Sequence, residues 1–156
     1  MGELVHVTKV KVQKEPGKGK VKKALIEGFP QPIRMGLHGG VKKFFHVESE
    51  EDLPTTLDYV VAALGSCLTG TLGSALEARS IPLGPDDLSA EVEGYIENIE
   101  NKPLITRVHV KYHLKVPQGK KAEADRAVSS HEKFCAVSQS LRRGITVELE
   151  AAIDEA

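Results

Sequence analysis

The two cysteines, Cys67 and Cys135, are the residues whose chemistry most needs an explanation in this 156-residue chain. Cys67 lies in the uncharged stretch VVAALGSCLTGT, and Cys135 lies in HEKFCAVSQSL. A thiolate is a strong nucleophile that peroxides oxidise, whereas a buried neutral thiol acts as a small core side chain. The residues alone therefore leave two interpretations open, a redox-active pair or two unrelated buried thiols.

The spacing argues against other kinds of cysteine site and against a metal site. Neither cysteine belongs to a C-x-x-C pair, which excludes zinc knuckles and thioredoxin-like motifs. In a reducing cytosol, two thiols are more typical of a transient redox couple than of a permanent disulfide. His109 and His113 share one face of a predicted strand with three cations, Arg107, Lys111 and Lys115. We therefore expect a solvated sheet face there and no metal site.

A reactive Cys67 needs a positive group from another segment of the chain. The cysteine lies about three turns inside its predicted helix, beyond the reach of the dipole at that helix's N-terminus. An apolar environment raises the pKa of a thiol, so the local surroundings disfavour a thiolate. Arg34 is the only arginine in the first 78 residues and is the candidate cation, with an exposed strand arginine as the alternative.

Composition and charge indicate one cytoplasmic domain. The 21 basic and 22 acidic residues are interspersed and the net charge is −1, so we expect no nucleic-acid or membrane partner. The first residues lack the apolar core of a signal peptide. The uncharged stretch 59–76 approaches the length of a membrane span, but half of it is Gly, Ser, Thr, Cys or Tyr, and Asp58 and Glu77 flank it. We predict a buried helix for this stretch.

The first half of the chain has the pattern of short strands followed by a long helix. We predict strands at 5–13, with a bulge or bend near 8–9, and at 23–28, 33–40 and 41–49. Thr55 and Asp58 have the spacing of a capping box, which predicts a helix start. Small residues at 65, 69 and 73 form a stripe along which another backbone could approach closely. The helix is therefore predicted to be central and covered on more than one side.

The second half predicts a strand pair, two helical segments and a last strand. The strand pair has a connection short enough for a hairpin, and Gly144 is the expected C-cap of the second helical segment. His131 lies one turn before Cys135, where it could favour a thiolate or could be an exposed helix residue. We predict a single α+β domain over 1–156, with N-terminal strands in 1–53, a central helix in 54–80, strands in 88–116, helices in 120–143 and a last strand in 144–153.

The two cysteine segments together resemble the OsmC/Ohr family of organic hydroperoxide reductases. DYVVAALGSCLTGTL is similar to the central-helix motif of that family, and HEKFCAVSQSL is similar to its C-[PA]-V-S-x-[SA]-L segment. With the order of elements, the resemblance covers most of the chain from about residue 30 onward. It implies antiparallel sheets wrapped around a long central helix, in an intertwined homodimer with active sites at the dimer interface.

The resemblance also implies a chemistry, that of a thiol-dependent peroxidase in the oxidative stress response. Cys67 would be the peroxidatic cysteine that attacks an organic hydroperoxide, Cys135 the resolving cysteine and Arg34 the activating cation. An external thiol, dithiol or lipoyl-type reductant would reduce the resulting disulfide, with no metal or bound cofactor.

Two departures from the family pattern place the chain in its divergent OsmC-like branch. The acid that holds the activating arginine, ten residues before the peroxidatic cysteine, is Leu57 here, and Asp58 lies about 100° further round the helix. The usual proline after the second cysteine is Ala136. The alternative is therefore a protein with this fold that binds a small molecule or senses redox state, with weak or no peroxidase activity.

Overall fold

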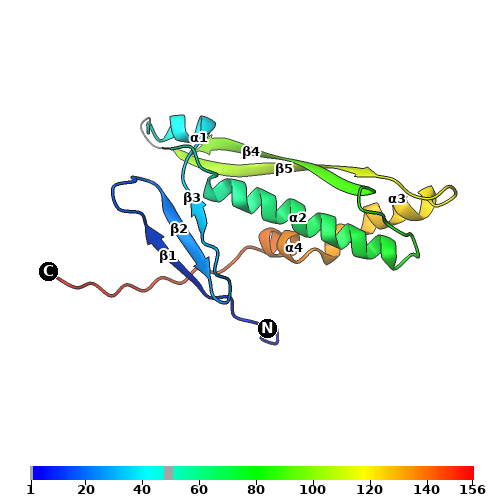
Figure 1. The fold of residues 1–156 in the computed structure, drawn as a ribbon, viewed down its shortest axis with the longest axis horizontal. Coiled ribbons are helices and arrows are strands. Elements are labelled where there is room, and N and C mark those ends of the chain that lie inside the picture. Colours follow the sequence, from blue (N-terminus) through cyan, green and yellow to red (C-terminus); the bar gives the residue numbers. More distant parts are fainter. Residues whose placement is uncertain (1, 48–50) are drawn as a thin grey trace. The chain divides into compact units, whose positions relative to one another are not determined.

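The chain folds into helices and strands that belong to two compact units (Figure 1). The computed structural model describes residues 2–47 and 51–156. Unit 1 comprises Met1–Val61 and Glu93–His109, and unit 2 comprises Ala62–Val92 and Val110–Ala156. In chain order, the elements are β1 (Val10–Lys14), β2 (Lys22–Ile26), β3 (Ile33–Met35), α1 (Gly39–Phe44), α2 (Thr56–Glu77), β4 (Leu88–Ile99), β5 (Lys102–Leu114), α3 (Lys121–Ser130), the 3-10 helix η1 (His131–Phe134) and α4 (Ala136–Arg143).

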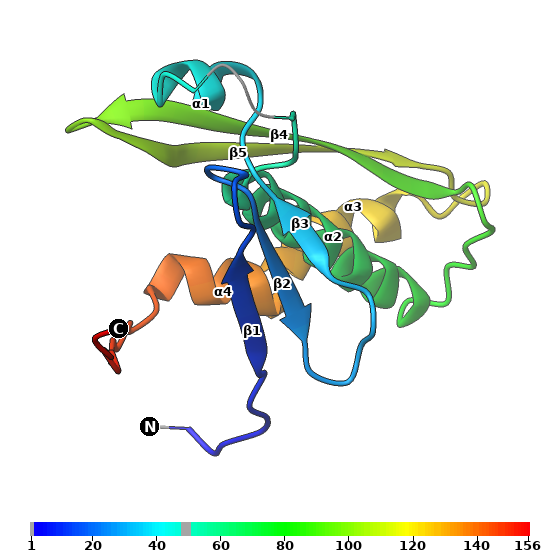
Figure 2. The same cartoon turned by 60° about the vertical axis from the view of Figure 1, so that its left-hand side comes forward.

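Unit 1 contains an antiparallel sheet in the order β1-β2-β3 (Figure 2). Ala24 in the middle strand pairs with Val12 on one side and with Ile33 on the other. The sheet confirms the predicted strands near 23–28 and 33–40, although the second ends at Met35. The strand predicted over 5–13 begins only at Val10, since residues 2–9 have no strand pairing.

The strand predicted over 41–49 is wrong, because residues 39–44 form helix α1. Val41, Phe44 and Phe45 are spaced i, i+3 and i+4, which is a helical period that a short apolar run conceals. Gly39 has φ +53, a conformation that costs glycine little and turns the chain into the helix. The end of the predicted strand, Glu48 and Ser49, lies outside the described residues.

Helix α2 begins at the predicted capping box. The Thr55 N–H donates to Asp58 Oδ2 at 2.7 Å, and the Asp58 N–H donates to Thr55 Oγ1 at 3.0 Å. By length and composition alone α2 could cross a membrane, a test that the core helices of soluble proteins also pass. Its buried residues recur at helical spacing and are Gly65, Leu68, Leu72 and Leu76. The helix thus presents one continuous buried stripe to the rest of unit 2.

The core of unit 2 forms where α2 meets α3 and the hairpin strands. Leu72 and Leu76 are fully buried and pack with Ile81, Ala124 and Ala127. Partly buried hydrophobic residues surround this cluster: Ala75, Leu83, Leu88, Tyr112, Leu114 and Val116. Burying a leucine contributes about 1.5–3 kcal/mol, so this cluster is the main support for the C-terminal half of α2.

The small-residue stripe of α2 lies against β4, as the sequence predicted for a close approach. A Cβ atom added to Gly65 would lie 2.6 Å from Val92 Cγ2, and one added to Gly73 would lie 3.8 Å from Leu88 Cδ2. In unit 1 the glycine is on the strand and the valine on the helix, since Gly94 of β4 leaves room for Val61 of α2. Glycine is therefore required at Gly65 because β4 leaves no room for a side chain.

The predicted hairpin is present, and the predicted last strand is not. Strands β4 and β5 pair through a tight turn in which Glu100 and Asn101 have φ 52 and 62, the positive values that such turns require. Residues 145–153 have no strand pairing, so the predicted strand over 144–153 is wrong for the single chain. Their apolar side chains are exposed, with Val147 at 75% and Leu149 at 93%. A strand needs a hydrogen-bonding neighbour, and none of the described strands pairs with this segment.

Replacing Gly65 with alanine tests the close approach of β4 to α2. We expect Gly65→Ala to lower the free energy of unfolding by about 1–3 kcal/mol, because the new methyl group overlaps Val92. Gly70→Ala is the matched control on the same helix, where an added Cβ meets nothing within 4 Å. We expect the control to be more stable than the parent by about 0.5–1 kcal/mol. Urea unfolding followed by circular dichroism measures both, and equal stability of the two variants would contradict the packing.

Candidate active site

The structure brings Cys67 and Cys135 together within unit 2. Cys67 is a half-buried residue of α2, and Cys135 is fully buried as the N-cap residue of α4. Both are free thiols, and their side chains hydrogen-bond to each other. The two segments that carry the sequence resemblance therefore meet at one site.

The first turn of α4 supplies the positive electrostatic field that Cys67 needs. The backbone N–H of Val137 lowers the pKa of the Cys67 thiol, and burial opposes this effect. Hydrogen bonds from the Cys135 side chain and from the Ala136 N–H lower the pKa further. Unpaired amides at a helix N-terminus favour an anion because they carry partial positive charge. Cys67 thus gains from the N-terminus of α4 what its own helix does not provide.

The pKa of Cys135 shifts upward, opposite to that of Cys67, so Cys135 is the protonated thiol of the pair. Burial raises the pKa of the Cys135 thiol, and the interaction with Cys67 raises it further. The Ser138 N–H donates to Cys135 Sγ at 3.4 Å, which partly offsets the burial. A single negative charge shared by two adjacent thiols therefore resides on Cys67.

The side chains of Glu132, Ser138 and Arg142 form a hydrogen-bonded group, the Glu132 clasp, that holds the first turn of α4. Sequence reasoning missed these residues. In this Glu132 clasp, Ser138 Oγ donates to Glu132 Oε1 at 2.7 Å and Arg142 Nε donates to the same oxygen at 2.5 Å. Hydrogen bonds from Ser138 and then Arg142 lower the pKa of Glu132. The available signal was the spacing, because Ser138 lies three residues after the N-cap and one turn before Arg142.

His131 does not fit either of the alternatives that the sequence left open. It is only 5% exposed, so it is not a surface residue of the helix. Its Nδ1–H donates to the Val128 carbonyl at 2.7 Å, and its Nε2 forms a hydrogen bond with the Tyr112 hydroxyl at 2.8 Å. Both nitrogens are therefore occupied away from Cys135. Burial, with the nearby charge of Cys135 as a second cause, raises the pKa of Tyr112 to about 12.

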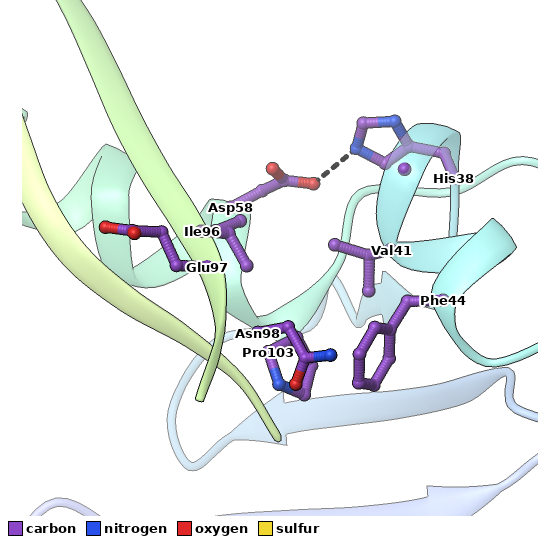
Figure 3. A pocket seen from close by; sticks show the side chains of 9 residues that line it. His38, Val41, Phe44, Asp58, Ile96, Glu97, Asn98 and Pro103 are labelled. Carbon is purple, nitrogen blue, oxygen red and sulfur yellow. Dashed lines mark hydrogen bonds and ion pairs between the residues drawn. The ribbon is translucent and has the colours of Figure 1, made fainter. Parts of the chain in front are cut away.

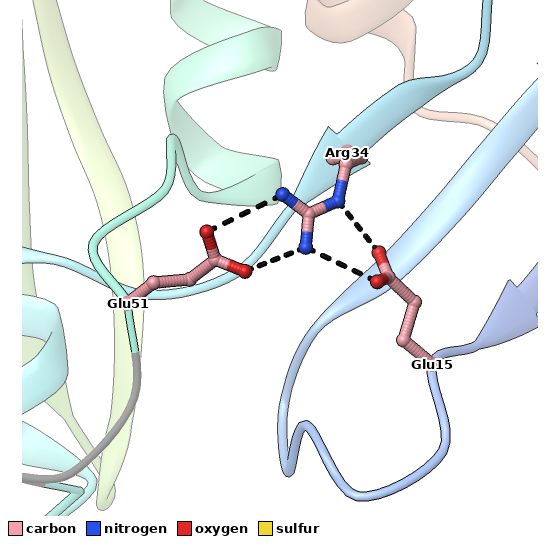
Figure 4. Close-up of polar contacts among 3 residues, drawn as sticks. All are labelled: Glu15, Arg34 and Glu51. Carbon is pink, nitrogen blue, oxygen red and sulfur yellow. Dashed lines mark hydrogen bonds and ion pairs between the residues drawn. The ribbon is translucent and has the colours of Figure 1, made fainter.

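Arg34 belongs to unit 1, where two carboxylates hold it (Figure 4). Its Nε and one terminal nitrogen donate to Glu15 at 2.8 and 3.1 Å, and its terminal nitrogens donate to Glu51 at 2.6 and 3.3 Å. The hydrogen bond from Arg34 lowers the pKa of each glutamate. Arg34 is thus a strand residue with 38% of its side chain exposed, as the alternative held, and it has two carboxylate partners. Its predicted role at Cys67 stays a prediction.

A cavity of about 340 Å³ in unit 1 contains the acid next to Leu57 (Figure 3). Asp58 Oδ2 lies 2.6 Å from His38 Nε2, so this acid binds a histidine as well as capping α2. Burial would raise the pKa of Asp58, but hydrogen bonds from the Thr55 N–H and from His38 outweigh it and lower the pKa. Apolar walls surround this pair, formed by Val41, Phe44, Ile96 and Pro103. The volume is at the lower end of small-molecule sites.

A metal site is not apparent in the described part of the chain. Among residues 2–47 and 51–156, no three His, Cys, Asp or Glu side chains are grouped so as to hold a metal ion. His113 instead pairs with Glu91, with 2.7 Å between Nε2 and Oε2. The nucleophilic groups that the structure brings together at the site are the two free thiols.

The fold and the site together define an α+β protein in which a long helix carries the more acidic thiol of a cysteine pair. The chain belongs to the family of OsmC-like proteins, whose sequence profile matches residues 49–150. This membership confirms the resemblance drawn from the two cysteine segments. Comparison with curated proteins gives no match.

Solved structures of this family have the same fold. An OsmC-like protein of unknown function from Vibrio cholerae has a TM-score of 0.71 at 12% identity, covering 87% of this chain and 94% of the other. An OsmC-like protein from Mycoplasma pneumoniae has a TM-score of 0.68 at 12% identity, covering 89% of each chain. An organic hydroperoxide resistance protein from Elizabethkingia anophelis has a TM-score of 0.63 at 16% identity, covering 90% of this chain and 91% of the other. At these identities the likeness confirms the predicted fold and nothing finer.

Replacing Ala136 with proline tests the contribution of the α4 amides to Cys67. Proline removes the Ala136 N–H, and the first position of a helix tolerates it. We expect the pH midpoint for alkylation of Cys67 by iodoacetamide to rise by up to about one unit, because a donor to the thiolate is lost. Ala136→Ser keeps the amide and should retain the parent midpoint. The same midpoint in the proline and serine variants would show that this amide does not act on Cys67.

Proposed function

We propose that this protein is a thiol-dependent peroxidase that reduces organic hydroperoxides through Cys67 and Cys135. The observation that supports this best is the pairing of a thiol of lowered pKa with a neighbouring thiol of raised pKa. A thiolate is the reactive form towards peroxides, and an adjacent second thiol captures the oxidised product. An isolated buried cysteine pair without this polarity would have no defined attacking sulfur.

In the first half of the reaction, Cys67 is oxidised and the hydroperoxide is reduced. The Cys67 thiolate attacks the terminal peroxide oxygen, an S–O bond forms, and the O–O bond breaks. The bonding electron pair leaves with the alkoxide, which takes a proton and becomes the alcohol. Cys67 is left as a sulfenic acid, and the amides of Ala136 and Val137 remain beside its sulfur.

In the second half, Cys135 resolves the sulfenic acid. Its sulfur attacks the Cys67 sulfur, an S–S bond forms, and the S–O bond breaks. The Cys135 proton and the hydroxyl group leave together as water. An external thiol, dithiol or lipoyl-type reductant then returns both cysteines to thiols by disulfide exchange and is itself oxidised to a disulfide.

The family supports a role in defence against organic peroxides. The structural neighbours include organic hydroperoxide resistance proteins from Elizabethkingia anophelis and Legionella pneumophila. By extension from those proteins, we propose a role for this chain in the oxidative stress response. We also propose that it acts in the cytoplasm and without bound metal or cofactor. Because these two proteins are only 16% and 15% identical to this chain, the cysteine pair supports the proposal more strongly than the likeness to them does.

A homodimer is the assembly that we propose for the active protein. The segment after α4 alternates apolar and polar side chains, and Ile145, Val147 and Leu149 are 68–93% exposed in the single chain. The segment before β1 has a similar pattern, with Val5 94% exposed. Exposed alternating segments are prone to pair with strands of another chain. Proteins of this family form intertwined homodimers, in which such segments have neighbours.

Steady-state turnover of cumene hydroperoxide with a dithiol reductant tests the proposed function. We expect Cys67→Ser to abolish turnover, since an alcohol at this position does not attack the peroxide. In a separate measurement without reductant, Cys135→Ser should consume about one equivalent of peroxide and stop at the sulfenic acid, because no second thiol is present to resolve it. Mass spectrometry of the oxidised parent should show a Cys67–Cys135 disulfide. Turnover that survives in Cys67→Ser would reject the proposal, and slow turnover in the parent would favour a binding or sensing role.

Arg34 is the second group whose contribution to this reaction needs a test. If Arg34 activates Cys67, Arg34→Gln will lower the peroxide rate at least about tenfold, as loss of a charged hydrogen-bond donor does. Glu15→Gln is the matched control, because it weakens the same ion-pair group and leaves the guanidinium in place. A normal rate in Arg34→Gln together with lowered thermal stability would assign Arg34 to the structure of unit 1 alone.

A further inference from the structure

The amides of the first turn of α4 are divided between the two thiols. The N–H groups of Ala136 and Val137 interact with Cys67, while the Ser138 N–H donates to Cys135 Sγ at 3.4 Å. These are three consecutive residues of one helical turn, so a rotation of α4 about its axis changes all three contacts together. The orientation of this turn therefore affects the stabilisation of both thiols, and the Thr71 side chain of α2 also lowers the pKa of Cys67.

The Glu132 clasp fixes that orientation from one side of α4. Ser138 and Arg142 lie one turn apart on the same face of the helix, and both donate to Glu132 Oε1. Ser138 is only 7% exposed, whereas the side chain of Arg142 is 68% exposed. The inner arm of the clasp, from Ser138 to Glu132, is therefore the less exposed of the two, although the Glu132 side chain is itself 38% exposed.

Backbone contacts connect the clasp directly to Cys135. The Cys135 N–H donates to the Glu132 carbonyl at 3.1 Å, and the Gln139 side chain donates to the same carbonyl at 3.3 Å. The Gln139 N–H donates to the Cys135 carbonyl at 2.9 Å. Glu132 thus anchors η1, the N-cap and the first turn of α4 as one piece.

From this geometry we infer that Ser138, held by Glu132, is a positioning residue that directs the α4 amides so that Cys67 rather than Cys135 is the attacking sulfur. Its hydroxyl group acts through the backbone turn and not by contact with substrate. The inference deepens the proposed peroxidase function and takes its catalytic meaning from it. The relative reactivity of the two thiols does not depend on the proposed function and can be measured without peroxide.

The other titratable groups around the thiols do not substitute for this positioning. Tyr112 on β5 stays neutral below its pKa of about 12 and forms a hydrogen bond with His131. His131 on η1 has both nitrogens occupied by Tyr112 and the Val128 carbonyl. Glu132 and Arg142 are paired with each other inside the clasp.

The test is the pH dependence of iodoacetamide alkylation in the reduced full-length protein, quantified for each cysteine by peptide mass spectrometry. In Ser138→Ala the ratio of Cys67 to Cys135 alkylation at pH 7 should fall about threefold to tenfold, as expected when one hydrogen bond is lost. The Cys67 midpoint should also rise by about half to one pH unit. Ser138→Thr keeps a hydroxyl group and should restore most of the parent ratio.

Ser129→Ala on α3 is the control. Its hydroxyl donates to the Asp125 carbonyl at 2.8 Å, is exposed and lies outside both the clasp and the first turn of α4, so the parent ratio should be retained. A folded Ser138→Ala protein, judged by its ellipticity, with the parent ratio and midpoint would overturn the inference, since a merely structural role lowers stability without moving either. If Ser138→Ala does not fold, Arg142→Gln removes the exposed arm instead, and an unchanged ratio in that variant overturns the inference.

Peroxide turnover on the same variants separates this inference from the proposed function. A shifted alkylation ratio in Ser138→Ala, in a protein that reduces no hydroperoxide, supports the positioning role and rejects the peroxidase. Normal turnover by the parent with an unshifted ratio in Ser138→Ala rejects only the positioning role.

Discussion

The interaction on which this site depends is between a thiol in the middle of one helix and the backbone amides at the start of another. Cys67 is too far along α2 to benefit from the positive end of its own helix. The N–H groups of Val137 and Ala136 provide that stabilisation instead. The same turn places Cys135 at the N-cap of α4, beside Cys67. One contact between two helices of unit 2 therefore supplies the stabilised thiolate and its neighbouring thiol together.

The rest of unit 2 keeps these two helices in register. Leu72 and Leu76 fix the C-terminal half of α2 in the core, and Gly65 lets the helix lie directly against Val92 of β4. On the other side of the site, Glu132 ties η1 to α4 through Ser138. The leucine side of the site is packed with apolar side chains, because leucines need only to be removed from water. The Glu132 side is polar, because buried amides and thiols need hydrogen-bond partners.

Within unit 1, Arg34 and the acid next to Leu57 each have polar partners. Arg34 makes four hydrogen bonds to Glu15 and Glu51, which stabilise its charge where it lies. The family's acid is replaced by Leu57, and the neighbouring Asp58 caps α2 and binds His38. In this chain the acid at the start of α2 is thus an aspartate that pairs with a histidine.

The sequence by itself determined the elements whose signals are local. The capping box at Thr55, the long helix, the hairpin and the two cysteine segments were all readable because they depend on neighbours in the chain. Local pattern misjudged α1, whose helical spacing is short, and residues 145–153, whose strand character needs a partner strand. Three features were decided only by the tertiary structure. They are the groups that stabilise Cys67, the burial of His131 against Tyr112, and the hydrogen bond between Ser138 and Glu132. The physical reason is that the stabilising groups at Cys67 are backbone N–H groups, which every residue except proline carries, so their direction is set by how the helices pack and not by residue type.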